Sequence, residues 1–322
     1  MRVWLRRWTA TLGMVVCGTM VGVAEAQPPG GHRGWRNEPV VATENLDVGG
    51  AKIRVEFAAG ETDLTRDVIL ARVKRAAQAV SVYYGRFPVK TAGVLIDPQP
   101  GDDLHGTTWG GVRGVQGFTR IRFGEHTTEK ELASDWVITH ELVHTAFPDQ
   151  DDDQNWIEEG LATYVEPLAR VQAGQIPAEK FWATMMHEME NGEPESGDRG
   201  LDHTHTWGRT YWGGAMFCLF ADVEIRKETK DQKGLQDALR GIVDAGGTID
   251  TDWSLSRAFD VGDKATGTKV LSEMYARWGS TPVHVDLDAL WKELGVKEGA
   301  RGIEFDAKAP LAGVREAITR AR

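Results

Sequence analysis

One five-residue segment, His140-Glu141-Leu142-Val143-His144, combines residue types that can do chemistry at a spacing that brings them together. Residues four apart lie on the same face of a helix, so His140 and His144 can present two imidazole nitrogens to one ion. Glu141 lies beside them, within reach of a water molecule at that ion. The pattern predicts a site for Zn²⁺ as cofactor, with Glu141 as the general base.

The pentapeptide alone is moderately specific, because it also arises by chance and an isolated histidine on an apolar helix is usually a packing or surface residue. A catalytic zinc ion takes three protein ligands and keeps one open position. A second segment with helical character, Trp156–Glu166, begins just downstream and carries further carboxylates. A third ligand is therefore expected from this second segment.

Together the two segments resemble the gluzincin zinc metallopeptidases, in which His-Glu-x-x-His is followed by a helix carrying a glutamate ligand. In the alanyl and leukotriene-type aminopeptidases this glutamate stands in a Trp-Leu-Asn-Glu-Gly-Phe-Ala context, and here Trp156-Ile-Glu-Glu-Gly-Leu-Ala aligns with it. The resemblance implies that Glu159, and not Glu158, completes a metal site with His140 and His144. The loop Asp149–Asn155 makes the connection a few residues shorter than usual.

Two further side chains gain roles from this resemblance. The block Thr210–Ala215, Thr-Tyr-Trp-Gly-Gly-Ala, resembles the Tyr-x-x-Gly-Ala helix start of the same aminopeptidases and of the glycyl aminopeptidase branch. It implies that the Tyr211 hydroxyl hydrogen-bonds the oxyanion of the tetrahedral intermediate, the alternative being a buried packing tyrosine. Glu166 lies two turns beyond Glu159, and the resemblance implies that its carboxylate accepts the second ring N–H of a histidine ligand. The alternative is a solvated helical glutamate.

One expected element of these aminopeptidases is missing. They carry a Gly-x-Met-Glu-Asn-like strand whose glutamate holds the free amine of the substrate, whereas Gly110–Phe118 offers glycines and no acid. Asp102 and Asp103 are possible substitutes, although a turn suits them equally. The segment Phe118–Phe123 is a candidate strand for pairing with an extended peptide. Endopeptidase and aminopeptidase action both stay open.

Two polar clusters have weaker functional interpretations. His203 and His205 alternate and allow a second metal site or an auxiliary oxyanion donor, although a polar loop is favoured. The acidic run Asp151–Asp153 allows calcium binding, but it lacks the spacing and the glycine of a dedicated calcium loop, so a solvated turn is favoured.

The elements that must position these residues fall into two groups. An antiparallel hairpin with Gly49-Gly50 at its turn, a helix capped by Asp63, and further short strands precede the His-Glu-x-x-His segment. From Thr128 the pattern is mostly helical to Arg240, and the last forty residues mix short helices and turns. The segments expected before Thr128 are strands at Glu38–Thr43, Ala51–Phe57, Gly93–Ile96 and Phe118–Phe123, a helix ending near Tyr84, and a loop at Gly101–Gly117.

The expected fold class is therefore α+β, and the resemblance implies a thermolysin-like metallopeptidase catalytic domain. A β-rich N-terminal sub-domain is expected at residues 37–127 and a helical sub-domain with the zinc site at residues 128–322. The zinc site is expected in the cleft between them.

The first residues are typical of an export signal. Three arginines precede the apolar run Thr11–Ala24, and Ala24-Glu25-Ala26 is a small-x-small cleavage pattern, which predicts a signal peptide at residues 1–26 and a flexible tail at 27–36. Only Cys218 remains after cleavage, so an intramolecular disulfide is excluded. The protein is expected to be exported, either to the periplasm or to the exterior, with no membrane span after signal cleavage.

The composition excludes some partners. The chain has 37 Lys and Arg against 48 Asp and Glu, a net charge of -11, and no basic run interleaved with aromatics, which argues against nucleic acid and anionic membranes. Its 12 tryptophans are best explained by packing rather than by ligand stacking.

The expected function is that of an exported zinc-dependent metallopeptidase acting on a peptide or protein substrate, with the oligomeric state open. Two alternatives remain: a zinc-bearing, non-catalytic peptide-binding protein of the same fold, and a metal-free exported binding protein in which the pentapeptide is accidental.

Overall fold

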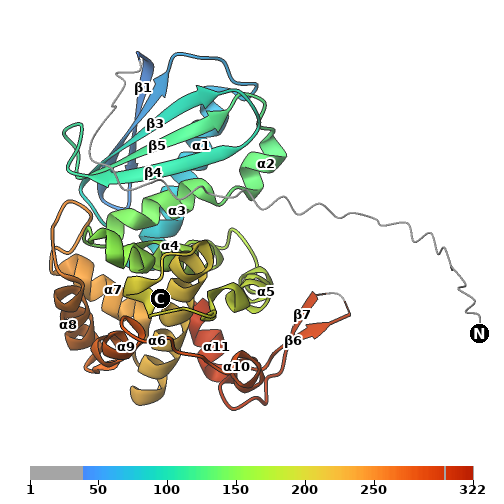
Figure 1. Ribbon diagram of the computed structural model, residues 1–322. Coiled ribbons are helices and arrows are strands. Elements are labelled where there is room, and N and C mark those ends of the chain that lie inside the picture. The colour runs from blue at the N-terminus through green and yellow to red at the C-terminus, as the bar shows by residue number, and fades with distance from the viewer. Residues whose placement is uncertain (1–38, 301, 322) are drawn as a thin grey trace, which may run out of the picture.

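The structure is a computed structural model that describes residues 39–300 and 302–321. Figure 1 shows a twisted sheet at one end and a larger helical body at the other, with α3 and α4 where they meet. The predicted signal peptide, 1–26, and tail, 27–36, lie outside the described residues. Within the described part of the chain, no helix is long and apolar enough to cross a membrane.

The chain alternates strands and helices at first and is then mostly helical. The strands are β1 Val40–Val48, β2 Ala51–Ala58, β3 Thr91–Gln99, β4 Leu104–Gly110, β5 Gly117–Gly124, β6 Val296–Gly299 and β7 Gly302–Phe305. The α-helices are α1 Arg66–Tyr84, α2 Glu129–Ser134, α3 Val137–Val143, α4 Asn155–Gln172, α5 Ala178–Glu188, α6 Gly214–Glu228, α7 Leu235–Asp244, α8 Leu255–Thr266, α9 Val270–Trp278, α10 Leu287–Leu294 and α11 Ala312–Thr319.

The five-stranded sheet has the order β1-β2-β3-β5-β4, with β2, β3 and β5 parallel and an antiparallel strand at each edge. The predicted hairpin with its turn at Gly49-Gly50 is confirmed. The prediction of a loop over the whole of Gly101–Gly117 is wrong, because β4 lies within it. The prediction that Phe118–Phe123 could pair with a peptide is also wrong, because β5 is bonded to β3 on one side and β4 on the other.

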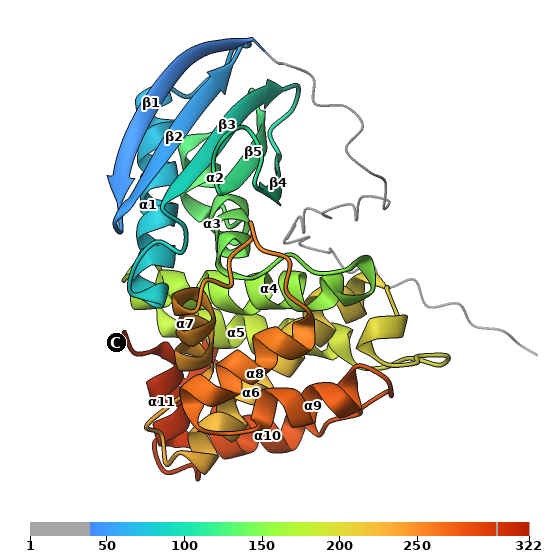
Figure 2. The same ribbon diagram turned by 90° about the vertical axis from the view of Figure 1, so that its left-hand side faces the viewer.

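Helix α1 covers one face of the sheet and is amphipathic in the way that its spacing predicts. Ile69, Val73 and Val80 are buried along one face. Its N-cap is Thr65, whose side chain accepts from the backbone N–H of Val68, and not Asp63 as predicted. Figure 2 shows α1 and α3 between the sheet and the helical body, so these two helices form part of the junction between them.

The helical body is built around the close approach of α4 and α6. A Cβ added to Gly160 would lie 2.3 Å from the Cα of Gly214, so two glycines are needed where the helices cross. Three tryptophans are almost fully buried in this core: Trp156, Trp182 and Trp278. Cys218 is also buried, with a free thiol.

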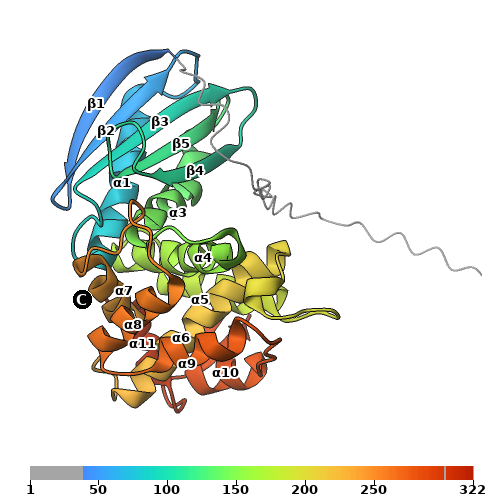
Figure 3. The same ribbon diagram turned by 60° about the vertical axis from the view of Figure 1, so that its left-hand side comes forward.

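Two features join or extend the helical body. The loop between α7 and α8 rises to the sheet (Figure 3), where a Cβ on Gly110 would meet the carbonyl oxygen of Ile249 and where Gln116 Nε2 donates to Asp250 at 3.0 Å. The hairpin β6–β7 near the C-terminus was not expected, because short helices and turns were predicted over the last forty residues.

Candidate metal centre

Helix α3 carries His140–Val143 of the His-Glu-x-x-His segment, and His144 begins the 3-10 turn η1, His144–Ala146, that follows it. Helix α3 is short and is held at its N-terminus by buried charges. Asp135 accepts from the backbone N–H groups of Val137 at 3.0 Å and Ile138 at 3.2 Å, which satisfies two free donors of the first turn. Arg72 of α1 pairs with Asp135 at 3.5 Å and donates to the Thr139 hydroxyl at 3.3 Å. The helix is therefore fixed in position independently of any metal ligand.

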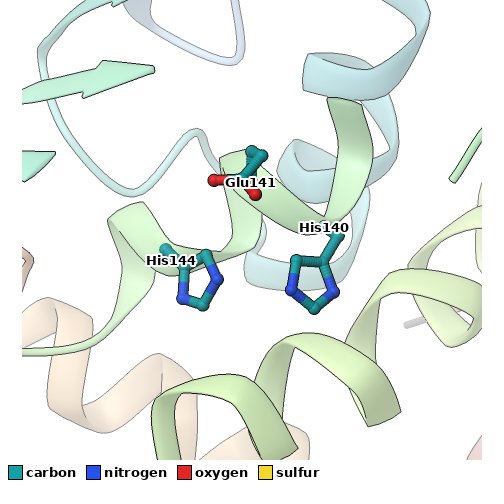
Figure 4. Close-up of side chains that lie close together, drawn as sticks. All are labelled: His140, Glu141 and His144. Carbon is teal, nitrogen blue, oxygen red and sulfur yellow. The ribbon is translucent and has the colours of Figure 1, made fainter. Parts of the chain in front are cut away.

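The side chains of the segment divide between two directions. In Figure 4 the rings of His140 and His144 point from α3 toward the neighbouring helix, whereas Glu141 points to the other side. One donor atom from each of the three side chains lies within 4.8 Å of the others. His140 and Glu141 are buried, and His144 is half-buried. The helical spacing thus brings together the residues that it was predicted to bring together.

Glu159 of α4 faces both imidazoles. Its Oε2 lies 3.1 Å from His140 Nε2 and 3.7 Å from His144 Nε2. In a tetrahedral zinc site with ligand distances of about 2.1 Å, neighbouring ligand atoms are about 3.4 Å apart. The two separations lie on either side of that value, so the donor set fits a zinc ion bound by two imidazoles and one carboxylate.

The adjacent Glu158 faces elsewhere. Burial, together with the nearby charge of Asp149, raises the pKa of Glu158 well above its usual range, while the backbone N–H of Gln150 hydrogen-bonds to it. Because α4 turns 100° per residue, neighbouring side chains cannot share one direction. The register of α4 therefore directs Glu159, rather than Glu158, toward His140 and His144, as the resemblance implies. Its role as a metal ligand stays a prediction.

The protonation states of the histidines and Glu159 suit this arrangement. Burial lowers the pKa of His144 to about 4, so this imidazole is neutral and has a lone pair free for a metal. Burial opposes the charge on His140, but the hydrogen bond and charge of Glu159 raise its pKa overall. For Glu159, burial is outweighed by His144, His140 and a hydrogen bond from Tyr211, which together hold its pKa below its usual range.

Glu141 lies against the edge strand β4. Thr108 Oγ1 donates to Glu141 Oε2 at 2.8 Å, and the same hydroxyl lies 2.9 Å from that of Thr119 on β5. A Cβ on Gly106 would be 2.2 Å from Glu141 Cγ, so only glycine leaves room for the carboxylate there. Burial raises the pKa of Glu141 to about 7, with a further contribution from the charge of Glu159. Such a carboxylate is suited to accepting and releasing a proton near neutral pH.

Tyr211 comes from the π-helical turn η5, Gly208–Gly213, immediately before α6. Its ring is half-buried, 6.3 Å from the ring of His140, and its hydroxyl is hydrogen-bonded to Glu159. The turn is held by a buried ion pair between Arg209 and Asp198 at 2.7 Å. π-Helical turns are rare and often occur at functional sites. The tyrosine hydroxyl is therefore bonded to a predicted metal ligand, a contact that a residue serving only packing would not need.

Three other predicted groups have different surroundings. Glu166 is buried and accepts from Arg170 at 2.8 Å, so the alternative of a solvated glutamate is wrong, and its carboxylate is bonded to an arginine. His203 and His205 are exposed, and His205 lies 3.5 Å from Asp153. Within residues 39–300 and 302–321, no cluster of three potential metal ligands contains these histidines or Asp153.

Sequence reasoning missed four residues at the site. Gly106 and Thr108 lie on β4, in a stretch assigned to a loop, while the glycines of Gly110–Phe118 were expected to be the equivalent of the substrate-binding strand. That expectation is wrong, because residues 111–116 form the turn between β4 and β5. Trp136 and Trp207 contact the rings of His140 and Tyr211, and their spacing of four from those residues was the available signal.

The chain is similar in structure to several solved proteins, among them an aminopeptidase N family protein and an M1 zinc metallopeptidase. An aminopeptidase N family protein from Idiomarina loihiensis superposes with a TM-score of 0.61 and 13% identity over 79% of this chain and 49% of its own. A mutant M1 zinc metallopeptidase from Deinococcus radiodurans, bound to a Tyr-Ser-Ala substrate, superposes with a TM-score of 0.51 and 18% identity over 76% of this chain and 52% of its own. The chain thus spans about half the length of each.

No protein-family profile matches the chain, and no curated protein does. The structural similarity establishes the fold, which is α+β and like that of the M1 metallopeptidase catalytic domain, with the His140, Glu141 and His144 group between the sheet and the helical body. The predicted fold class is confirmed.

Proposed function

We propose that the chain is an exported zinc-dependent metallopeptidase in which His140, His144 and Glu159 hold the metal and Glu141 is the general base. The observation that carries the proposal is the placement of the Glu159 carboxylate at 3.1 and 3.7 Å from the two imidazole nitrogens, with a second buried carboxylate beside them. A hydrogen-bonded triad without metal would need neither a second carboxylate nor this near-equal spacing.

The residues divide the chemistry of peptide hydrolysis among them. Bound zinc would polarise the scissile carbonyl and acidify a water molecule. Glu141, with a pKa near 7, takes the proton from that water and delivers it to the leaving amine. Thr108 holds one carboxylate oxygen of Glu141 and so fixes the direction of proton transfer. The Tyr211 hydroxyl exchanges its hydrogen bond to Glu159 for one to the developing oxyanion.

The substrate is proposed to bind as an extended peptide along the outer edge of β4. Within residues 39–300 and 302–321, β4 is an edge strand with β5 as its strand neighbour, it runs past Glu141, and an edge strand can bond an added strand through its backbone. Between Leu104 and Gly110 the strand carries no acid, and Asp102 and Asp103 lie in the exposed turn before it. With no carboxylate on this strand to hold an α-amine, cleavage of internal peptide bonds is favoured over removal of N-terminal residues.

The proposal is tested by metal analysis and peptide-library cleavage with the mature chain and its Glu141→Gln variant. We expect about one zinc per chain in both proteins. Cleavage is expected only in the wild type, with a loss of about 10³-fold or more in the variant. Mass spectrometry of the products distinguishes internal from N-terminal cleavage.

Other results for zinc content and cleavage would favour one of the two alternative functions. Zinc in both proteins with cleavage in neither would favour the non-catalytic peptide-binding protein. Absence of zinc after purification without chelators and attempted reloading would overturn the metallopeptidase proposal. Export is tested separately by N-terminal sequencing of the protein from a host cell's periplasm and medium, where a start at Gln27 is expected.

A further inference from the structure

The tryptophans of the described chain differ in how far they are exposed to solvent. Trp156, Trp182 and Trp278 are at most 2% exposed and fill the helical core, as the composition led us to expect. Trp136 and Trp207 are 39% and 40% exposed. Single exposed apolar residues are ordinary on protein surfaces, so exposure alone indicates nothing. Trp136 and Trp207 are of interest because of the side chains that they contact.

Both exposed tryptophans contact rings of the metal centre. Trp136 meets the ring of His140 edge-on at a centroid distance of 5.1 Å, and Trp207 stacks on Tyr211 at 6.3 Å. His140 and Tyr211 are themselves stacked at 6.3 Å. The four rings therefore form a row of successive contacts, with the metal-ligand candidate His140 and the oxyanion candidate Tyr211 in the middle and a partly exposed tryptophan at each end.

The backbone positions from which both indoles project are held in place. The carbonyl oxygen of Trp136 accepts the backbone N–H of His140 at 3.0 Å, so the backbone of Trp136 is tied to the first turn of α3. Trp207 is the residue immediately before η5, the turn that the buried pair of Arg209 and Asp198 anchors. Rigid aromatic surfaces lose little conformational entropy on binding and present large contact areas.

We propose that Trp136 and Trp207 are specificity-determining residues that bind aromatic or large aliphatic side chains of the peptide on either side of the scissile bond. The inference rests on the proposed function, because the row places its exposed ends next to the group that would be hydrolysed. A peptide extended past His140 and Tyr211 has side chains within reach of both indoles. Covering the exposed part of an indole with an apolar side chain removes both surfaces from water.

The test compares two peptide series that carry either phenylalanine or alanine next to the scissile bond, with the zinc-loaded full mature chain. The wild type is expected to favour phenylalanine by about tenfold or more in kcat/KM. Trp136→Ala and Trp207→Ala should each lower kcat/KM for the phenylalanine series by about tenfold, mainly through KM, and leave the alanine series nearly unchanged. The Trp→Phe variants should restore most of the preference.

Val82→Ala provides the control, because Val82 is an exposed apolar residue on α1 and takes no part in the ring contacts that join Trp136 and Trp207 to the site. Thermal melts and zinc content identify variants that fail to fold. Equal use of both series by the wild type, or equal losses for both series in the tryptophan variants, would overturn the inference while leaving the peptidase proposal intact.

A binding measurement keeps the inference testable if no peptide is cleaved. The same peptides are titrated onto zinc-loaded Glu141→Gln protein, with and without each Trp→Ala change, and calorimetry reports the affinity. The inference is supported, even where no peptide is cleaved, if each Trp→Ala change weakens the binding of the phenylalanine peptides about tenfold and leaves the binding of the alanine peptides unchanged. Identical affinities for both series, or no binding of any peptide, contradict it.

Discussion

Two differently built walls enclose the candidate metal centre. The buried wall consists of α3, the turn η1 with His144, and α4, with His140 and Glu159 facing each other and Asp135 and Arg72 fixing the end of α3. The open wall consists of β4 and η5, with Thr108 and the half-buried Tyr211. The buried wall supplies every predicted metal ligand and the proposed base Glu141. The open wall supplies Thr108, which bonds that base, and Tyr211, which would meet the oxyanion.

This difference indicates that one set of residues would determine metal affinity and another set the rate of turnover. Changes in the buried wall are expected to alter metal affinity or the free energy of unfolding. Changes in the open wall are expected to alter the rate while zinc content and stability stay the same. For three of the substitutions below, a residue of the same type elsewhere in the chain provides a matched control.

The largest effect is expected for Glu159→Ala, compared with Glu158→Ala. Removal of one of three protein ligands should lower zinc affinity by more than about hundredfold, because a single lost outer partner already costs about 10- to 100-fold. Glu158 faces Asp149, so its removal should leave zinc affinity within about threefold of the wild type. Competition with a chromophoric chelator measures both, and equal losses in the two variants would contradict the register of α4.

In the open wall, Tyr211→Phe is expected to lower kcat by about hundredfold, as for the loss of an oxyanion donor. KM and zinc content should change little, because the ring and its contact with His140 are retained. Steady-state kinetics with metal analysis of the same sample is the measurement. A large loss of zinc would instead assign Tyr211 to the buried wall, as a partner that holds Glu159.

Gly160→Ala tests the packing that supports the buried wall. Its new Cβ would meet the backbone of Gly214 at 2.3 Å, so α4 and α6 must separate, and the free energy of unfolding should fall by about 2 kcal/mol. Gly313→Ala on α11 is the control, because nothing lies within 4 Å of its Cβ position and it should stabilise by about 0.5–1 kcal/mol. Denaturant unfolding of the two variants should therefore shift in opposite directions.

The smallest of these effects is expected for Thr108→Val, which keeps the shape of the side chain and removes its hydrogen bond to Glu141. Loss of a bond that orients a general base should lower kcat by about tenfold, with zinc content unchanged. Thr107→Val is the matched control, because the Thr107 hydroxyl donates to the carbonyl oxygen of its neighbour Gly106 rather than to Glu141. An unchanged rate in Thr108→Val would remove β4 from the positioning of the base.

The buried wall could be predicted from the sequence because its information is local. His140 and His144 share a helix face by spacing alone, and the resemblance adds the register that presents Glu159. The helix α1 and the first hairpin were predicted for the same reason, since apolar periodicity and a Gly-Gly turn are short-range signals. Where two cap-forming residues lie close together, as with Asp63 and Thr65, sequence alone does not distinguish them.

The open wall could not be predicted because its information is long-range. The β4 sequence, Leu-His-Gly-Thr-Thr-Trp-Gly, has no alternating apolar pattern and is ordered by pairing with β5 and by contact with Glu141, more than thirty residues away. The β6–β7 hairpin is local, but it was missed because strands of four residues are too short for an alternating pattern to stand out. The two exposed tryptophans were counted as core, because composition does not show which face of a helix a residue occupies.

The position of β4 at the edge of the sheet has a consequence for which proteins could be substrates. A sheet edge accepts only a backbone whose own hydrogen-bonding groups are free, and a folded substrate has almost none exposed in that form. Under the proposed function, the susceptibility of a protein would therefore follow the free energy with which one of its segments opens locally. Loops, chain ends and misfolded polypeptides would be cleaved, whereas stable native proteins in the same compartment would be spared.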